Sequence, residues 1–143
     1  MLVVDDFKDY EIIDSSNGMK LERWGNIYLL RPDPQVIWDN GNLLEKYPNI
    51  NAVYYRSNKG GGHWENLRKT PANWEISYRD LTFNIKQMGF KHTGLFPEQA
   101  INWRYMIDKI QNSHRTIKVL NLFAYTGGAT VACAAAGAAE VCH

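Results

Sequence analysis

A short glycine-containing segment near the end of the chain has the residue types of a ligand-binding loop. Phe123–Gly128 (FAYTGG) follows a nearly continuous apolar run, Ile117–Phe123, and precedes an alanine-rich stretch, Ala129–Ala136, with Gly137 after it. Such an apolar run is typical of a strand buried on both faces of a parallel sheet, and the alanines favour a helix. In open α/β sheets ligands bind beyond the carboxyl ends of the strands. We therefore expect the Phe123–Gly128 loop to line a binding site.

The loop lacks the two common phosphate-binding patterns. A dinucleotide loop needs G-x-G-x-x-G, whereas Gly127 and Gly128 are followed here by Ala129 and Thr130. No lysine follows the glycines, which excludes a P-loop. S-adenosylmethionine carries no phosphate and needs a loop that comes close to its methionine and ribose parts. The pattern favours this methyl donor over NAD or ATP, and a purely structural turn is the alternative.

Two segments together resemble a known family. Leu120–Ala136 (LNLFAYTGGATVACAAA) and Phe90–Trp103 (FKHTGLFPEQAINW) are similar to class I rRNA large-subunit methyltransferases and their relatives. The N-terminal stretches ERWG and RPDPQVIW resemble the same group, so the resemblance covers nearly the whole chain. It implies an enzyme that uses S-adenosylmethionine as cofactor and rRNA bases as substrate, with a base atom attacking the donor methyl directly.

The resemblance also assigns residues to the cofactor. It places five residues in contact with S-adenosylmethionine and four nearby; the first set is Phe123, Ala124, Tyr125, Thr126 and Gly127, and the second is Lys91, Thr93, Phe96 and Gln99. From the residues alone, Lys91 and Thr93 could equally form a polar loop between two domains, and Gln99 could face solvent. His92 is expected to be an orienting or structural residue, because methyl transfer from a sulfonium has little need of a general base.

Two features of the family are not present. The acidic residue that holds the ribose hydroxyls just after the second strand has no counterpart, since that strand, Glu140–His143, is the last segment of the sequence. The cysteine nucleophile of the members that methylate carbon 5 of cytosine is not matched by Cys133 or Cys142. We therefore expect catalytic residues to lie beyond His143, and the chain to be an N-terminal fragment that is inactive alone.

The first two thirds of the chain predicts short β-strands. The expected strands are Tyr10–Ile13, Met19–Trp24, Ile27–Arg31, Gln35–Trp38, Asn51–Arg56, Trp74–Tyr78 and Leu81–Lys86. Asn17-Gly18 and Gly25-Asn26 predict two-residue hairpin turns. Leu43–Tyr47 predicts a helical turn that Pro48 ends. The three glycines at 60–62 predict a loop over Ser57–Thr70.

The fold class that follows is α+β, with two domains. Residues 1–88 form a β-rich N-terminal domain. Residues 89–143 contain a bridging segment, a helix that starts near Pro97, and the first βαβ portion of a Rossmann-like methyltransferase domain. The helix has an apolar stripe formed by Ala100, Trp103, Ile107 and Ile110, which indicates that Trp103 belongs to the core.

Basic and aromatic residues around the glycine loop suggest an RNA contact. The candidate RNA-binding residues are Arg56, Lys59, Trp64, Arg68 and Lys69, because single-stranded RNA binding combines cations with aromatic stacking surfaces. The alternative is a flexible surface loop whose stem aromatics belong to the core.

Composition limits the remaining possibilities. The 143 residues are 45% hydrophobic and 22% charged, with no apolar run near the roughly 20 residues of a membrane span and no signal-peptide pattern, so a cytoplasmic protein is expected. Two cysteines and four histidines without ligand spacing predict neither disulfide nor metal. The rival functions are a non-catalytic nucleic-acid- or protein-binding module and, less favoured without G-x-G-x-x-G, an NAD oxidoreductase. The sequence leaves the oligomeric state open.

Overall fold

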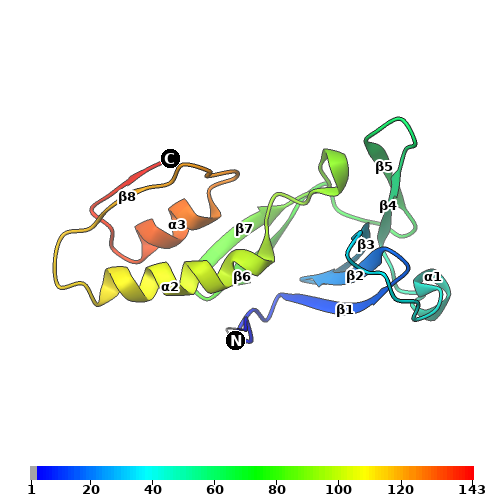
Figure 1. Ribbon diagram of the computed structural model, residues 1–143, viewed down its shortest axis with the longest axis horizontal. Helices are drawn as coiled ribbons and strands as arrows, with labels where there is room; N and C mark the ends of the chain where they lie inside the picture. Colours follow the sequence, from blue (N-terminus) through cyan, green and yellow to red (C-terminus); the bar gives the residue numbers. More distant parts are fainter. Residues whose placement is uncertain (1–2) are drawn as a thin grey trace. The chain divides into compact units, whose positions relative to one another are not determined.

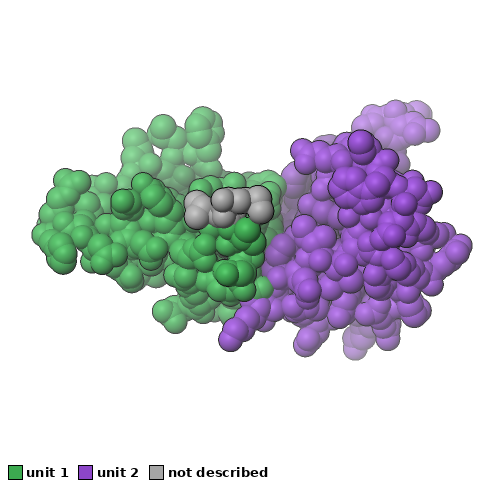
Figure 2. Space-filling model, turned by 60° about the horizontal axis from the view of Figure 1, so that its bottom comes forward, with its two compact units in different colours: residues 1–7, 77–83, 95–143 green, residues 8–76, 84–94 purple. Residues whose placement is uncertain are grey.

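The structure is a computed structural model that describes residues 3–143, and it has a mixed, strand-rich α+β architecture (Figure 1). The described chain divides into two compact units, coloured differently in Figure 2. Unit 1 contains residues 3–7, 77–83 and 95–143, and unit 2 contains residues 8–76 and 84–94. Strands β6 (Trp74–Tyr78) and β7 (Leu81–Ile85) form a hairpin. The chain passes from unit 2 to unit 1 after residue 76 and back to unit 2 after residue 83, and both boundaries fall within this hairpin.

Unit 2 is built on a five-stranded sheet in the order β1-β2-β3-β4-β5. The strands are β1 (Tyr10–Ser16), β2 (Met19–Trp24), β3 (Ile27–Pro32), β4 (Ala52–Arg56) and β5 (Gly62–Asn66). All neighbouring pairs are antiparallel except β3 and β4, which run parallel. The predicted Asn17-Gly18 turn is confirmed, with φ values of 49° and 74°, the left-handed pair that a tight hairpin requires.

The prediction of a loop over Ser57–Thr70 is wrong, because β5 lies inside it. The turn is confined to residues 57–61, in which Gly60 and Gly61 have φ values of 88° and 72°. Gly62 already pairs with Arg56 across the hairpin, and a Cβ at position 62 would collide with the carbonyl oxygen of Tyr55. Glycine at this position therefore permits close strand pairing and does not indicate a flexible segment.

The predicted strand Gln35–Trp38 is also wrong. The carbonyl oxygens of Val36 and Trp38 accept hydrogen bonds from the backbone of the β1–β2 turn, from Gly18 and Asn17 respectively, each at 2.8 Å. The segment's backbone therefore bonds to the end of a hairpin and not to the edge of a strand, so no ladder forms.

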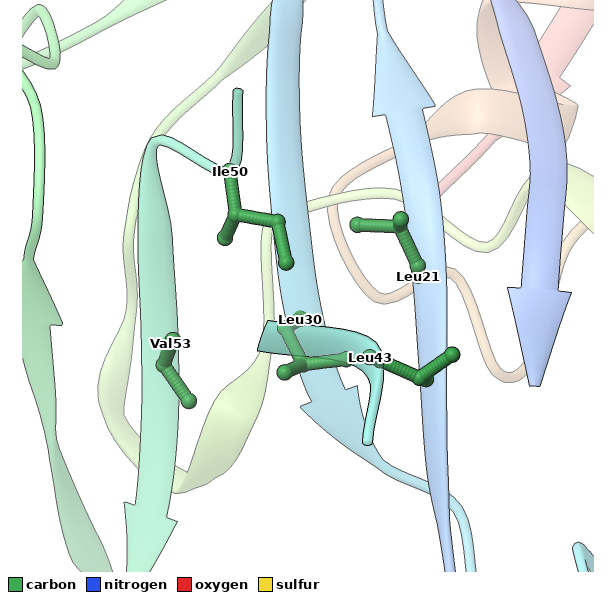
Figure 3. Close-up of a cluster of buried hydrophobic side chains, with 5 residues drawn as sticks. All are labelled: Leu21, Leu30, Leu43, Ile50 and Val53. Atoms are coloured by element: carbon green, nitrogen blue, oxygen red, sulfur yellow. The ribbon is translucent and has the colours of Figure 1, made fainter. Parts of the chain in front are cut away.

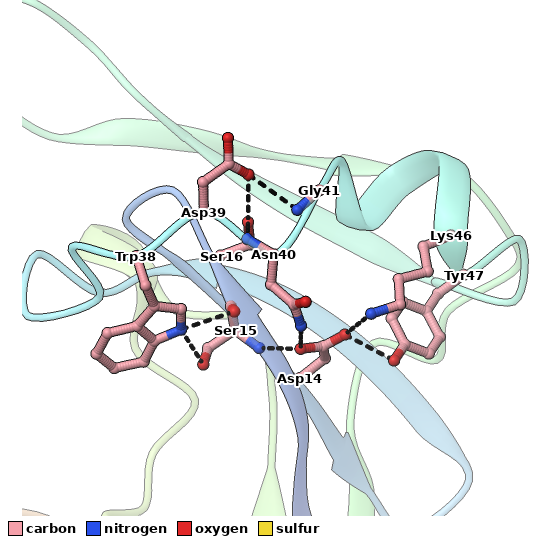
Figure 4. A network of polar contacts seen from close by, with 9 residues as sticks. All are labelled: Asp14, Ser15, Ser16, Trp38, Asp39, Asn40, Gly41, Lys46 and Tyr47. Carbon is pink, nitrogen blue, oxygen red and sulfur yellow. Dashed lines mark hydrogen bonds and ion pairs between the residues drawn. The ribbon is translucent and has the colours of Figure 1, made fainter.

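A polar network then joins the following residues to β1 (Figure 4). The carboxylate of Asp14 accepts hydrogen bonds from Lys46 (2.6 Å), Tyr47 (2.8 Å) and Asn40 (2.7 Å). Lys46 ends the one-turn helix α1 (Leu43–Lys46), the predicted helical turn, whose first N–H groups are capped by Asn42. The network holds residues 40–47 against the sheet.

The α1 segment covers an apolar cluster of unit 2. Its buried side chains come from β2, β3, α1 and β4, and one lies just before β4. They are Leu21, Leu30, Leu43, Ile50 and Val53 (Figure 3). Each is less than 5% exposed, so this cluster supplies much of the hydrophobic stabilisation of the unit.

A buried ion pair crosses the same sheet. Glu22 on β2 has no exposed surface, and its carboxylate accepts two hydrogen bonds from Arg31 on β3, at 2.5 and 2.8 Å. Tyr10 donates a third at 2.7 Å. Burial alone would raise the pKa of Glu22, but the hydrogen bonds and charge of Arg31 outweigh it and hold the pKa below its ordinary value. Glu22 is therefore ionised inside the unit.

Replacing Arg31 alone should be costly, because it leaves a buried carboxylate without its cation. We expect Arg31→Met to lower the free energy of unfolding by about 3 kcal/mol or more. The Glu22→Met/Arg31→Met double variant should recover most of this loss, since both charges are gone. Urea denaturation followed by tryptophan fluorescence measures both; a double variant no more stable than Arg31→Met would contradict the interpretation.

Acid should destabilise unit 2 through Asp14. The hydrogen bonds from Lys46 and then Tyr47 hold the pKa of Asp14 far below its ordinary value. Because the folded pKa is depressed, the contribution of Asp14 to stability is complete above about pH 4 and is lost as the pH falls below that value. Asp14→Asn should therefore lower stability at pH 7 and flatten its fall below pH 4. Parallel stability–pH curves for both proteins would refute this.

Unit 1 contains the helix predicted to start near Pro97 and a βαβ unit after it. A 3-10 turn (Pro97–Gln99) leads into α2 (Ala100–Gln111), and β8 (Lys118–Leu120), α3 (Gly128–Ala135) and β9 (Glu140–Cys142) form a βαβ unit. Strands β8 and β9 pair in parallel, which is the topology that a helical crossover permits.

The core of unit 1 gathers on α2. Trp103 is 3% exposed, as its place on the apolar stripe predicted, and its ring lies 5.1 Å from Phe83, 5.8 Å from Tyr78 and 6.5 Å from Phe7 between centroids. Offset and edge-on aromatic pairs of this kind add to the energy of burial.

The prediction that Ile117–Phe123 is buried on both faces is wrong. The strand ends at Leu120, and Leu120, Leu122 and Phe123 are 65%, 73% and 95% exposed. Within residues 3–143, β9 is the one strand that pairs with β8, so the apolar run has a neighbour along one edge only.

Candidate cofactor-binding site

The loop after β8 is held at both ends by hydrogen bonds. The backbone N–H of Asn121 donates to Cys142 on β9 (2.9 Å), and its side-chain amide donates to Thr130 on α3 (3.0 Å). The N–H of Gly127 donates to Ala124 (2.8 Å), which closes a tight turn. Gly127 has φ 92° and is the residue that precedes α3, so the glycine is needed where the chain turns into the helix.

This loop forms one wall of a cavity of about 360 Å³ in unit 1. Two elements line it: the segment from Leu95 into α2, and the loop from β8 to the first turn of α3. The lining residues are Leu95, Phe96, Gln99, Trp103, Asn121, Phe123, Ala124, Tyr125, Thr126, Gly128 and Ala129. The two segments that carry the family resemblance therefore meet at one cavity.

The cavity brings together six of the nine residues that the sequence assigned to the cofactor: Phe96, Gln99, Phe123, Ala124, Tyr125 and Thr126. Gly127 supplies the turn and is not one of the lining residues. Lys91 and Thr93 belong to unit 2.

The lining of the cavity is aromatic and uncharged. The rings of Phe96 and Tyr125 lie 4.9 Å apart between centroids, and Tyr125 has φ 53°, a left-handed conformation that is uncommon for an aromatic residue. The side-chain oxygen of Gln99 accepts a hydrogen bond from Asn102 at 2.8 Å. Among the described residues that line the cavity, none carries a formal charge. Such a surface suits an aromatic or cationic ligand better than a pyrophosphate.

Lys91 and Thr93 have defined roles within unit 2. The ammonium of Lys91 donates to the carbonyl of Pro32 at 2.6 Å. Burial and the neighbouring charges of Arg56, Lys20 and Arg31 lower the pKa of Lys91. Thr93 is 1% exposed, and its carbonyl accepts from the N–H of Lys86 at 3.2 Å.

Five lining residues were not assigned to the site from the sequence. These are Leu95, Trp103, Asn121, Gly128 and Ala129. Asn121 had a usable signal, because it is an uncharged polar residue inside the apolar run Ile117–Phe123. For Gly128 the reason is tertiary: a Cβ there would lie 3.1 Å from the indole of Trp103, so glycine allows α3 to begin close to α2.

The candidate RNA-binding residues do not gather in one place. Arg56 and Lys59 lie at the turn of the β4–β5 hairpin, whereas Arg68 and Lys69 follow the other end of β5. The indole N–H of Trp64 donates to the carbonyl of Met88 (2.8 Å), and its ring packs edge-on against Tyr54, so Trp64 is engaged within the unit.

The two cysteines differ in environment. Cys133 is buried in α3 with its Sγ 3.7 Å from the sulfur of Met106, and burial raises the pKa of its thiol. It is a packing residue and not a nucleophile, as its place in an alanine helix indicated. In residues 3–143 no three His, Cys, Asp or Glu side chains are grouped as metal ligands, and no helix has the length and apolarity to cross a membrane.

The cavity lies at the carboxyl end of the first strand of a parallel βαβ unit, which is the position at which open α/β sheets bind small molecules. Comparison with known proteins gives a more specific relationship. Ribosomal RNA large subunit methyltransferase K/L of Allochromatium vinosum is 38% identical over 85 residues, which is 59% of this chain and 11% of that protein. The protein of the same name from Colwellia psychrerythraea is 32% identical over 83 residues, 58% of this chain and 11% of that protein.

Solved structures are also similar to this chain. The SAM-dependent methyltransferase from Agrobacterium tumefaciens is 34% identical and superposes with a TM-score of 0.85 over 95% of this chain and 43% of that chain. A chain from Streptococcus mutans, 18% identical, has a TM-score of 0.66 over 96% of this chain and 38% of that chain and shows a shared fold. No protein-family model matches.

The chain is therefore homologous to ribosomal RNA large subunit methyltransferases K/L and to solved SAM-dependent methyltransferases, which confirms the resemblance seen in the sequence. It spans about a tenth of the length of these curated relatives and 43% of the Agrobacterium chain.

Two aromatic residues that line the cavity should differ in their contribution to stability. Phe123→Ala should change the free energy of unfolding by less than about 0.5 kcal/mol, because the ring is 95% exposed. Trp103→Ala should cost about 3–5 kcal/mol, because it removes the centre of the unit 1 core. Thermal denaturation of both variants checks this; a large loss with Phe123→Ala would mean that the ring is packed.

Proposed function

We propose that this chain forms part of an S-adenosylmethionine-dependent methyltransferase that acts on rRNA bases. The observation that carries the proposal is the uncharged aromatic cavity where the Phe123–Gly127 loop meets Phe96 and Gln99. Homology to rRNA and other SAM-dependent methyltransferases, which are larger proteins than this chain, supports the choice of cofactor and substrate. We also propose that residues 89–143 are the bridging segment, helix and first βαβ portion of the methyltransferase domain.

The chemistry of the cavity fits this cofactor. S-adenosylmethionine supplies a methyl group on a positively charged sulfonium. Aromatic faces attract such a cation, and Phe96 and Tyr125 provide two rings 4.9 Å apart. A cavity that binds a sulfonium needs no cationic side chain, whereas NAD or ATP requires groups that neutralise phosphate. The uncharged lining therefore favours the methyl donor.

The residues of the chain act by binding and positioning. S-adenosylmethionine, when bound, would supply the methyl group to the substrate atom, and the residues of this chain would hold it in place. The rigid loop between β8 and α3, fixed by Asn121 and Gly127, sets the place of the donor. The amides of Gln99 and Asn121 offer hydrogen bonds to its polar groups. Alignment of this kind accounts for much of the rate in such reactions.

Cofactor binding is testable without activity. Saturating S-adenosylhomocysteine should raise the melting temperature by about 5 °C at a hundredfold excess over Kd, because a ligand that binds only the folded state stabilises it. Tyr125→Ala should abolish the shift. Tyr105→Ala is the matched control, since Tyr105 is an exposed tyrosine of α2 outside the cavity lining. A shift with NAD and none with S-adenosylhomocysteine would overturn the proposal.

A further inference from the structure

A second, differently charged cavity lies in unit 2 beside the turn between β4 and β5, two strands that Figure 1 labels. A cavity of about 250 Å³ there is lined by Tyr54, Arg56, Ser57, Gly60, Gly61, Phe90 and Lys91. Both of its charged side chains are cations. This cavity shares no residue with the cofactor-binding candidate, whose lining carries no charge.

In the described part of the chain, the carboxylates near this cavity form ion pairs with other cations. Lys20 lies 3.7 Å from Glu22 and 3.5 Å from Asp33, and Arg31 is paired with Glu22. These two carboxylates are therefore matched by Lys20 and Arg31, which leaves Arg56 and Lys91 in excess. Among residues 3–143 no carboxylate lies within ion-pair distance of Arg56, which is exposed. Burial lowers the pKa of Lys91 most, the charges of Arg56, Lys20 and Arg31 lower it further, and the charge of Asp33 raises it.

The backbone that presents Lys91 is strained and firmly held. Phe90 and Lys91 are consecutive non-glycine residues with φ of 56° and 68°, a conformation that costs about 1–2 kcal/mol for each. Arg31 donates to the carbonyl of Lys91 (2.9 Å), Trp64 donates to that of Met88 (2.8 Å), and Lys91 donates to Pro32 (2.6 Å). Strain that the surroundings maintain in this way is concentrated at functional positions. Its result here is a Phe90 ring that is 69% exposed beside a lysine in the cavity.

A larger cavity of about 780 Å³ adjoins the first and shares Tyr54 and Arg56 with it. Its walls are mainly apolar and include Leu30, Val53 and Pro32. The amides of Asn17 and Asn42 and the carboxylate of Asp39 also line it, and Asn17 donates to Asp39 at 2.9 Å. Tyr54 is 2% exposed, and its hydroxyl has no hydrogen-bond partner in the described residues.

We propose that unit 2 binds single-stranded RNA here, with a phosphate between Arg56 and Lys91 and the adjoining base in the apolar cavity. A cationic cavity for phosphate next to an apolar one with amides at its rim is the combination that an unstacked nucleotide needs. The exposed ring of Phe90 gives the next base a stacking surface. The inference takes RNA from the proposed function but does not depend on cofactor binding.

The test is fluorescence anisotropy of a labelled single-stranded RNA of about twelve nucleotides with the full chain, without cofactor, at several salt concentrations. Arg56→Gln should weaken binding about five- to tenfold and reduce the slope of log K against log salt by about 0.7, the effect of losing one phosphate contact to a single strand. Arg115→Gln is the matched control: an exposed arginine of unit 1, outside both cavities of unit 2, that should leave affinity within twofold. Phe90→Ala should weaken binding at least fivefold without changing the slope.

Three results would overturn the site. One is absence of RNA binding by the unchanged protein. Another is an equal effect of Arg56→Gln and Arg115→Gln, which would mean diffuse attraction. The third is full displacement of the RNA by millimolar AMP, which would indicate a mononucleotide site. RNA binding without a response to S-adenosylhomocysteine would retain this site and reject the proposed methyltransferase function, whereas the reverse result would reject only this site.

Discussion

A carboxylate removed from water stays ionised only if a cation meets it, and this requirement organises unit 2 around Glu22 and Arg31. Arg31 is this cation, and it donates two hydrogen bonds to Glu22. Its remaining guanidinium nitrogen donates to the carbonyl of Lys91. Its guanidinium also lies over the ring of Trp24 at 5.2 Å from the centroid. One side chain therefore joins β2, β3 and the segment 84–94. The left-handed backbone at Phe90 and Lys91 depends on that connection, and so does the cationic cavity that it forms with Arg56.

The chain carries two candidate sites, one in each unit, and only one of them is lined by charged side chains. The cavity in unit 1 is aromatic and uncharged, which suits a sulfonium ligand, and the cavity at Arg56 and Lys91 has two unbalanced cations, which suit a phosphate. In an rRNA methyltransferase these requirements belong to the two substrates of one reaction. Because the charge difference comes from side chains on separate units, a change at Arg56 leaves the lining of the cofactor-binding candidate intact.

Local patterns predicted most of the elements because their causes are local. Asn17-Gly18 requires left-handed φ at both positions, Pro97 starts a helix, and Gly137 (φ 95°) follows the end of α3, so each is readable from two or three residues. The two wrong predictions of strand and loop depend on partners outside the segment concerned. Gln35–Trp38 bonds to the turn at Asn17, and the chain after Gly61 pairs with β4, and neither partner is visible in the segment itself.

The sequence by itself determined the α+β class, the turns, the FAYTGG loop and the relationship to methyltransferases, because these depend on residue type and short spacing. Tertiary structure decided which residues share a cavity. It brought Phe96 and Gln99 to the loop after β8, added Asn121 and Gly128, and separated Arg56 from Arg68 although both had been grouped as RNA-binding. It also paired Lys20 and Arg31 with carboxylates and left Arg56 and Lys91 without them. Charge balance is a property of neighbours in space, and spacing along a chain does not reveal it.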